Sequence, residues 1–425
     1  GNEICELTIG PPAHGGACIA RDESGRVVFV RHALPGERVR ARIIDRQKRM
    51  AWADAIEILE GSPDRIPSVW PAAGPGGVGG GELAHVSPQG QRRWKSQVLV
   101  DQLGRIGRER VLQQIDAIGG VEVQPAPGDE GSASLLGRRT RIECVVDAEG
   151  FLGMRQYRSH KIVRLDSMPL AAVQINELPV WEGNKVFSSL PQGSRIRLIA
   201  PPGGTPVICT DHGCWDGEGN SWDGPLHWRI SHRQGSDDYA VRPWGFWQTH
   251  RCGAEVLARN VEEIVSAHCP SRVMELYSGA GLFSLPLSRV VGERGALVTL
   301  EGDEAAVADA ANNLGRSACE PFVGDVDGGA VRELNDYIGG AEVIVADPPR
   351  AGAGQEVCHA MASTGAQCIV LVSCDPAAAS RDLHDLCEKG YRISDMRAWD
   401  LFPYTHHFEV MTVLDASNKH VVALS

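Results

Sequence analysis

The sequence predicts a multidomain protein with an N-terminal OB-type β-barrel, a mainly β middle domain and a C-terminal α/β Rossmann-like domain. Two observations predict this order. Short strand patterns separated by glycine turns fill residues 4–60, whereas apolar strands alternate with helical patterns from about residue 240. The 425-residue length suits two to four domains. We expect the domains to span residues 1–62, 63–240 and 241–425.

The first domain contains strand-like runs at residues 26–30, 37–43 and 52–58. Several short strands within 60 residues are typical of a small OB-type barrel. Residues 61–90 are rich in glycine and proline and read as a linker or irregular loop. Apolar residues then recur at helical spacing over 91–118, a helix that we expect to pack on the C-terminal domain. Strand-like runs and turns across 135–235 complete the middle domain.

The last domain contains four apolar strand patterns, at residues 272–276, 296–300, 342–346 and 368–372. Helical patterns between them predict a parallel sheet. Open sheets of this kind bind ligands at the carboxyl ends of their strands. The residues that follow these strands are therefore the first candidates for a site.

The charge is unevenly distributed. There are 42 basic and 54 acidic side chains, a net charge of −12, which by itself argues against a nucleic-acid partner. Residues 241–425, however, hold 14 basic and 25 acidic side chains, so the acidity is concentrated there. Basic side chains gather at 26–49 and again at 138–164. The second stretch includes Arg138, Arg139, Arg155 and Arg158. Such stretches are either solvated faces or a surface that binds a polyanion.

Features that would direct the chain to a membrane or an oxidising compartment are not evident. No apolar run approaches 18 residues, and the N-terminal segment does not resemble a signal peptide. Twelve cysteines are scattered singly, which favours free thiols in a cytoplasmic protein. Cys209, His212 and Cys214 offer three soft ligands, but their spacing fits no common zinc pattern. We expect no metal site.

A glycine turn follows the first strand of the last domain. Gly279 and Gly281 allow the backbone to approach a ligand closely. Glu301 ends the next strand, about 20 residues later, where an acid can accept hydrogen bonds from a ribose. Asp325 follows a further short run and can face an adenine. The combination indicates a nucleoside cofactor, either a dinucleotide or S-adenosylmethionine.

Reactive side chains follow the other strands. Asp347 begins the stiff corner Asp-Pro-Pro-Arg that ends at Arg350. Cys374 ends the next strand, just before a helical pattern, where a helix N-terminus can lower a thiol pKa. His406, His407 and Glu409 precede the terminal strand and offer a base and groups to orient it.

This set, in this order, resembles the S-adenosylmethionine-dependent RNA uracil-C5 methyltransferases. The family usually has Asn where Asp375 stands and a small aliphatic residue where Phe408 stands. Residues 246–248, Phe-Trp-Gln, look like the family's aromatic-x-Gln cofactor motif. Upstream, residues 13–16, 27–30 and 33–38 resemble a TRAM domain, an RNA-binding barrel of the OB type. The resemblance covers almost the whole chain.

The resemblance implies a role for each matching residue. Cys374 would add to C6 of the uracil and Glu409 would remove the C5 proton, while Asp347 and Arg350 orient the base. The cofactor residues would be Gln248, Tyr277, Gly279, Gly281, Glu301, Asp325 and Asp347. The RNA contacts would be Phe246, Arg138, Arg139, Arg155 and Arg158. A TRAM-like domain favours ribosomal over transfer RNA, and we expect a monomer.

One departure from the family is large. Many ribosomal-RNA members hold an iron–sulfur cluster on four cysteines. Trp70, Val78, Gly81 and Met168 stand at the corresponding positions here. Since a cluster needs thiolate ligands, the sequence predicts none.

Three alternatives remain open. The first is C5 methylation of transfer RNA. The second is an amino-group methyltransferase, which also uses an Asp-Pro-Pro-like corner but needs no thiol. The third is a non-enzymatic RNA-binding protein with a vestigial domain, against which intact Cys374 and Glu409 argue.

Overall fold

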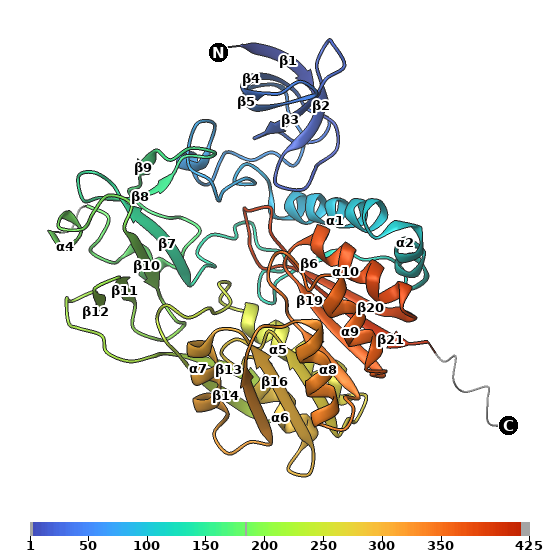
Figure 1. Cartoon of the computed structure of the whole chain (residues 1–425). Coiled ribbons are helices and arrows are strands. Elements are labelled where there is room, and N and C mark those ends of the chain that lie inside the picture. The colour runs from blue at the N-terminus through green and yellow to red at the C-terminus, as the bar shows by residue number, and fades with distance from the viewer. Residues whose placement is uncertain (1–2, 183–184, 418–425) are drawn as a thin grey trace.

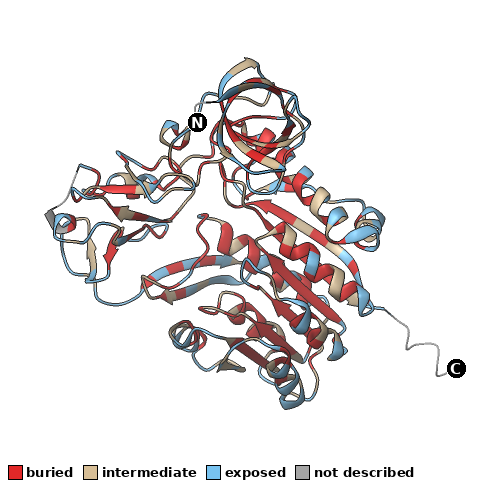
Figure 2. Cartoon of the chain, turned by 45° about the horizontal axis from the view of Figure 1, so that its top comes forward, coloured by how far each residue is buried: buried red, intermediate tan, exposed pale blue. Residues whose placement is uncertain are grey.

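The computed structural model describes residues 3–182 and 185–417 and confirms the multidomain fold (Figure 1). The N-terminal barrel lies at the top of the view, the middle β domain to its side, and the α/β domain below. Buried residues are concentrated along the sheets and on the helix faces that cover them (Figure 2). No helix in the described part of the chain is long and apolar enough to cross a membrane.

The N-terminal barrel is a five-stranded sheet with the order β1-β4-β5-β3-β2. Its strands are β1 (Ile4–Thr8), β2 (Cys18–Arg21), β3 (Val27–Arg31), β4 (Arg38–Arg46) and β5 (Met50–Glu60). Alternate side chains of these strands fill one core, which also receives Trp94 and Val98 from the helix that follows. The barrel is therefore packed against the helical segment.

Residues 61–87 have little regular structure beyond the 3-10 turn η1 (Pro71–Ala73), yet Trp70, Val78 and Leu83 are fully buried. After them come α1 (Pro88–Arg105), α2 (Arg108–Ala117) and the short strand β6 (Val123–Pro125). Ser87 caps α1 by accepting a hydrogen bond from the Gly90 N–H.

These elements belong to the C-terminal domain, as expected for the helical segment. Leu99 and Leu103 of α1 share the core of the large sheet. Buried Lys95 of α1 lies 2.5 Å from Asp400. Within the range expected to hold a linker and a middle domain, α1 contributes to the core of the large sheet, and the strands from β7 to β12 form a separate sheet.

The middle sheet has six strands in the order β12-β11-β10-β7-β8-β9. Its elements are β7 (Arg141–Val146), β8 (Leu152–Arg155), β9 (Ile162–Arg164), α3 (Val173–Asn176), α4 (Lys185–Ser188), β10 (Arg195–Ile199), β11 (Val207–Thr210) and β12 (Gly213–Asp216). Cys209 and Cys214 are paired across the β11–β12 hairpin and form a disulfide. The expectation of twelve free thiols is wrong for this pair, because the hairpin register brings the two side chains together.

The C-terminal domain is built on an eight-stranded sheet with the order β17-β16-β15-β18-β19-β21-β20-β6. Its strands are β15 (Arg272–Leu276), β16 (Ala296–Glu301), β17 (Cys319–Val323), β18 (Val343–Ala346), β19 (Cys368–Ser373), β20 (Tyr391–Asp400) and β21 (Glu409–Ala416). The first five strands in this order are parallel. Strand β21 is antiparallel to both of its neighbours.

Two helical layers and a hairpin cover this sheet. The helices are α5 (Gly253–Ser266), α6 (Ser284–Val291), α7 (Glu304–Leu314), α8 (Gly328–Tyr337), α9 (Gln355–Ser363) and α10 (Pro376–Glu388). The hairpin of β13 (Leu226–His232) and β14 (Gly235–Val241) packs on α5 and α7. Separate apolar clusters lie on the two faces of the sheet, as expected for strands that are buried on both sides.

Candidate active site

The three predicted catalytic residues meet at one edge of the large sheet. Asp347 follows β18, Cys374 follows β19, and Glu409 begins β21. In the register, Ala346 lies beside Leu371, and Ser373 lies beside Val410. Parallel strands end at a common edge, which is why residues far apart in sequence come together here.

The carboxylates of Asp347 and Glu409 both have raised pKa values. Glu409 is 4% exposed, and its Oε2 atom is buried without a hydrogen-bond partner in the described structure. Burial, reinforced by the charge of Asp347, raises the pKa of Glu409 well above its usual value. Burial also raises the pKa of Asp347 to about 7. Two neighbouring carboxylates, one buried and one half-buried, resist double ionisation, so the pair is suited to taking up a proton.

The charges of these two acids affect the pKa of the Cys374 thiol. Burial, followed by the charges of Glu409 and Asp347, raises its pKa to about 12, and only Arg350 acts in the opposite direction. The sequence led us to expect a lowered pKa from the N-terminus of α10. That expectation is wrong for the ligand-free protein, because burial and the adjacent acids outweigh the helix terminus.

The predicted cofactor turn lies between β15 and α6. Gly279 has φ +55°, and a Cβ there would meet no atom within 4 Å, so the backbone faces open space. Glu301 accepts hydrogen bonds from the Gly279 and Asp303 N–H groups at 3.0 and 2.7 Å. Asp325 lies next to this acid, since its Oδ1 is 3.7 Å from the Cβ position of Gly302. An open glycine turn beside fixed carboxylates fits the nucleoside part of S-adenosylmethionine.

Three other predicted residues flank this turn. Tyr277 adopts φ +60°, and its N–H donates to the Leu300 carbonyl at 2.8 Å. Gln248 is 6% exposed and precedes α5, whereas Phe246 is 65% exposed. Arg141 lies over the Phe246 ring at 4.9 Å. Phe246 therefore presents an aromatic face to solvent, as a residue that stacks on a base would.

Two residues that sequence reasoning did not include in the site contact it, and both come from outside the C-terminal domain. His14 Nε2, from the barrel, lies 3.0 Å from Oδ2 of Asp375, the residue after Cys374. Glu82 accepts a hydrogen bond from the His406 N–H at 3.2 Å. Gly16 permits this contact, since a Cβ there would lie 2.7 Å from the Glu82 Cβ. The His-Gly-Gly sequence of the barrel was the available signal.

His406 and His407, which precede Glu409, take part in the contact with Glu82. The rings of His406 and His407 lie 3.9 Å apart, and His406 Nδ1 is 3.5 Å from Glu82 Oε2. Burial opposes ionisation of Glu82, but the His406 hydrogen bond and charge outweigh it and lower the pKa to about 2. This carboxylate therefore anchors the loop that carries Glu409.

The four arginines predicted to contact RNA fall into two groups. Arg138 bonds to buried Asp129 at 2.9 Å, and Arg139 Nε is buried without a partner in the described residues. Arg155 and Arg158 are exposed. Arg158 also lies over the Trp52 ring, at 4.7 Å, between barrel and middle domain. Only the second pair offers guanidinium groups to a polyanion.

The four positions that correspond to cluster cysteines do converge in space. Trp70, Val78 and Met168 are at most 2% exposed and belong to one apolar core. A Cβ at Gly81 would lie 2.8 Å from the Trp70 ring. Carbon side chains and one thioether cannot supply four thiolates, so the residues present do not fit an iron–sulfur cluster.

Comparisons with known proteins agree with this geometry. Residues 331–417 match the family described as tRNA (Uracil-5-)-methyltransferase, and residues 2–56 match the TRAM domain. The chain is 31% identical to the 23S rRNA (uracil(1939)-C(5))-methyltransferase RlmD of Halomonas elongata, over 96% of this chain and 89% of that protein. The chain belongs to the RNA uracil-C5 methyltransferase family. It is an S-adenosylmethionine-dependent enzyme whose substrate is RNA.

Two further relatives extend over the whole chain. An uncharacterized RNA methyltransferase of Streptomyces avermitilis is 38% identical, covering 98% of this chain and 99% of its own. The Pyrococcus abyssi tRNA (uracil-54, C5)-methyltransferase, solved with S-adenosyl-L-homocysteine, has a TM-score of 0.66 at 21% identity. It covers 96% of this chain and 99% of its own. That likeness shows the shared fold.

Proposed function

We propose that this methyltransferase modifies a uridine of ribosomal RNA through a covalent bond between Cys374 Sγ and uracil C6. The observation that carries the mechanism is the placement of Cys374 beside two carboxylates with raised pKa values at one sheet edge. Ribosomal RNA is supported by the relatives named 23S rRNA methyltransferases and by the TRAM domain.

Each of the four residues at the sheet edge has a separate role in the proposed methyl transfer. The Cys374 thiol loses its proton as Sγ adds to C6, and ionised Asp347, whose charge acts on this thiol, would accept that proton. This addition makes C5 nucleophilic. S-adenosylmethionine supplies an electrophilic methyl group when bound. Once C5 is methylated, ionised Glu409 removes the C5 proton, and the electrons of that bond expel the Cys374 thiolate. Asp347 and Arg350 orient the uracil edge.

The RNA must deliver its uridine to this edge. Extruding a base from a stack costs a few kcal/mol. Exposed Phe246 would stack on a displaced base, and Arg155 and Arg158 would hold flanking phosphates. Gln248, Tyr277, Gly279, Gly281, Glu301 and Asp325 would hold the cofactor.

Trapping the covalent intermediate tests the mechanism. Glu409→Gln, incubated with S-adenosylmethionine and unmodified ribosomal RNA, should give a protein–RNA adduct that survives a denaturing gel. Adding Cys374→Ala should abolish the adduct, whereas adding Cys252→Ala, at another half-buried thiol, should leave it. Methyl transfer that persists in Cys374→Ala would instead support an amino-group methyltransferase.

Mapping 5-methyluridine tests the substrate. A strain lacking the gene should lose one or more 5-methyluridines from 23S rRNA, as measured by mass spectrometry. Loss from transfer RNA alone would overturn the ribosomal assignment without affecting the mechanism.

A further inference from the structure

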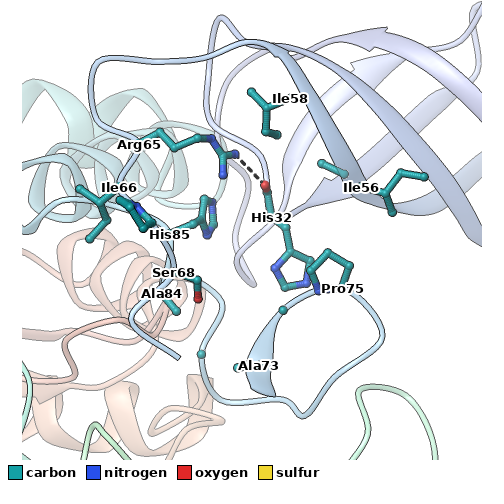
Figure 3. A pocket seen from close by; sticks show the side chains of 14 residues that line it. His32, Ile56, Ile58, Arg65, Ile66, Ser68, Ala73, Pro75, Ala84 and His85 are labelled. Carbon is teal, nitrogen blue, oxygen red and sulfur yellow. Dashed lines mark hydrogen bonds between the residues drawn. The ribbon is translucent and has the colours of Figure 1, made fainter. Parts of the chain in front are cut away.

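A cavity outside the candidate active site lies between the barrel and residues 65–85, which follow it in the chain (Figure 3). Its volume is about 430 Å³, within the usual range of small-molecule sites. Ile56 and Ile58 of β5 form one apolar wall, and Ile66 and Pro67 form another. Ile56 is 36% exposed, so apolar surface reaches the mouth of the cavity. None of the predicted active-site residues lines it.

Two buried imidazoles carry unused hydrogen-bonding atoms on the cavity wall. His32 is 7% exposed and His85 is 5% exposed, and Figure 3 shows both rings at the cavity. His32 Nε2 and His85 Nδ1 are buried and have no partner in the described structure. His85 Nε2 lies 3.1 Å from the Ala33 carbonyl, so Nε2 carries the proton and Nδ1 keeps a lone pair. A buried polar atom without a partner is costly unless a ligand satisfies it.

The wall is held in place by a dense polar network. His32 has φ +63°, a left-handed conformation, and its carbonyl accepts a hydrogen bond from Arg65 Nη2 at 2.8 Å. Arg65 also bonds to both carboxylate oxygens of Glu37, at 2.7 Å each. Glu37 in turn accepts from the Leu34 and Ser62 N–H groups. The cavity is thus fixed before any ligand arrives.

The chemistry of the wall disfavours a metal ion. Burial lowers the pKa of His32 to about 3, and the charge of Arg31 adds to this effect. Burial likewise lowers the pKa of His85 to about 4. The rings are therefore neutral at pH 7, which is the form that binds metals, but the residues lining the cavity include no cysteine or carboxylate to add a third ligand. The groups of three metal ligands in the described residues lie elsewhere. A flat, mainly apolar ligand with a hydrogen-bonding edge fits better.

The cavity shares one chain segment with the active site. Gly81, Ala84 and His85 line the cavity. Between them, Glu82 bonds to His406, and the Leu83 N–H donates to the Tyr404 carbonyl at 3.0 Å. The residues that line the cavity are therefore neighbours in sequence of the two residues that hold the catalytic loop.

We propose that this cavity binds an unstacked nucleobase of the substrate RNA, a nucleotide other than the uridine that is methylated. The inference rests on the RNA substrate of the proposed function. His85 Nδ1 would accept from an amino or imide N–H of the base, and His32 Nε2 would complete the edge. The isoleucine and proline side chains would cover the faces of the base, as in other sites that read single-stranded RNA.

Blocking the cavity tests the proposal. Ile56→Trp would place an indole at the mouth, and Ile4→Trp is the matched control, since Ile4 is an exposed isoleucine of β1 outside the cavity. The probe is a 23S rRNA transcript from a sequence that the wild-type enzyme methylates. We expect Ile56→Trp to raise Kd and KM roughly 5- to 100-fold with little change in kcat. Ile4→Trp should match the wild type. Equal affinity of both variants for the transcript would overturn the proposal.

A second variant and a crosslink locate the base. His32→Asn removes the imidazole, yet Asn tolerates the left-handed backbone. It should weaken RNA binding while the circular dichroism spectrum is unchanged. A transcript with 6-thioguanosine or 4-thiouridine should crosslink to a peptide within residues 56–85. The absence of that crosslink, or stoichiometric Zn²⁺ binding that His32→Asn abolishes, would overturn the proposal. Failure of the wild type to methylate any RNA would instead refute the proposed function.

Discussion

Buried and half-buried carboxylates of this enzyme have pKa values shifted in opposite directions at two places. At the active site, Asp347 and Glu409 have raised pKa values and no cationic partner within hydrogen-bond distance among the described residues. At the contacts between domains, Glu82, Asp129 and Asp375 have lowered pKa values, because histidine or arginine bonds outweigh the effect of burial. The carboxylates with lowered pKa values are paired with cations, whereas the two at the site that we propose to be catalytic are not.

The largest effect should come from the unpaired group. Asp347→Asn removes the ionisable group that we propose orients the uracil, and we expect kcat/KM to fall about 10²- to 10⁴-fold. The same change removes a charge that is unfavourable in the folded protein, so Tm at pH 8 should rise by roughly 3–6 °C. Calorimetry and a tritium methyl-transfer assay would measure both. A variant that loses both stability and activity would show that Asp347 is structural.

Removing a carboxylate that is paired with cations should lower the stability of the protein instead of raising it. Asp129 is 1% exposed and lies 2.9 Å from both Arg138 Nε and His250 Nε2. Asp129→Ala leaves these donors buried, and we expect about 3–5 kcal/mol less unfolding free energy in urea. Asp238→Ala, at the exposed pair with Arg229, is the control and should cost under about 1 kcal/mol. Equal costs would remove the distinction between buried and exposed pairs.

The pH dependence sharpens the comparison. The folded pKa of Asp347 is about 7 against an ordinary 3.8, so its stabilising contribution is complete below pH 3.8 and is lost as pH rises towards 7. The gain in Tm from Asp347→Asn should therefore be absent near pH 4 and maximal above pH 7. Glu82 has the opposite sign, since its contribution is complete above its ordinary 4.5 and is lost as pH falls towards 2. Melting curves of wild type, Asp347→Asn and Glu82→Gln measured in parallel across pH 2–8 would show whether the signs differ.

The activity should follow the active-site carboxylates. Because Glu409 acts when ionised and its pKa is raised, kcat/KM for methyl transfer should increase with pH across the neutral range. A flat profile between pH 6 and 8 would indicate that RNA binding restores an ordinary pKa or that another residue is the base.

The smallest effect is expected at the edge of the barrel. Asp375 Oδ1 caps α10 through the Ala378 N–H at 2.8 Å, while Oδ2 faces His14. Asp375→Asn keeps the cap but removes the charge. A double-mutant cycle with His14→Asn should give a coupling free energy of about 0.5–1.5 kcal/mol. A coupling of zero would show that this contact does not join the barrel to the catalytic loop.

Local patterns were enough to predict the positions of the parallel strands and the residues at their ends. Strand β19 and Cys374, for example, follow from one apolar run and the rule that such sheets bind ligands at their carboxyl edge. The partnership of His14 with Asp375 spans 361 residues and leaves no local trace. Glu82 was hidden in a glycine-rich segment that resembles a flexible linker, and its burial depends on packing that a single sequence does not show.

Strand β6 is short, but its partner strand lies much later in the chain, so the two cannot pair until most of the protein has been synthesised. It pairs with β20, so Val123–Pro125 and the helices before it are translated long before the partner strand that ends at Asp400. At ordinary ribosome speeds that interval is roughly 15–55 s. During this time the apolar faces of α1 and α2 have no sheet to cover. The barrel precedes these helices in the chain, and its core, which receives Trp94 and Val98 of α1, can cover part of that apolar surface in the meantime.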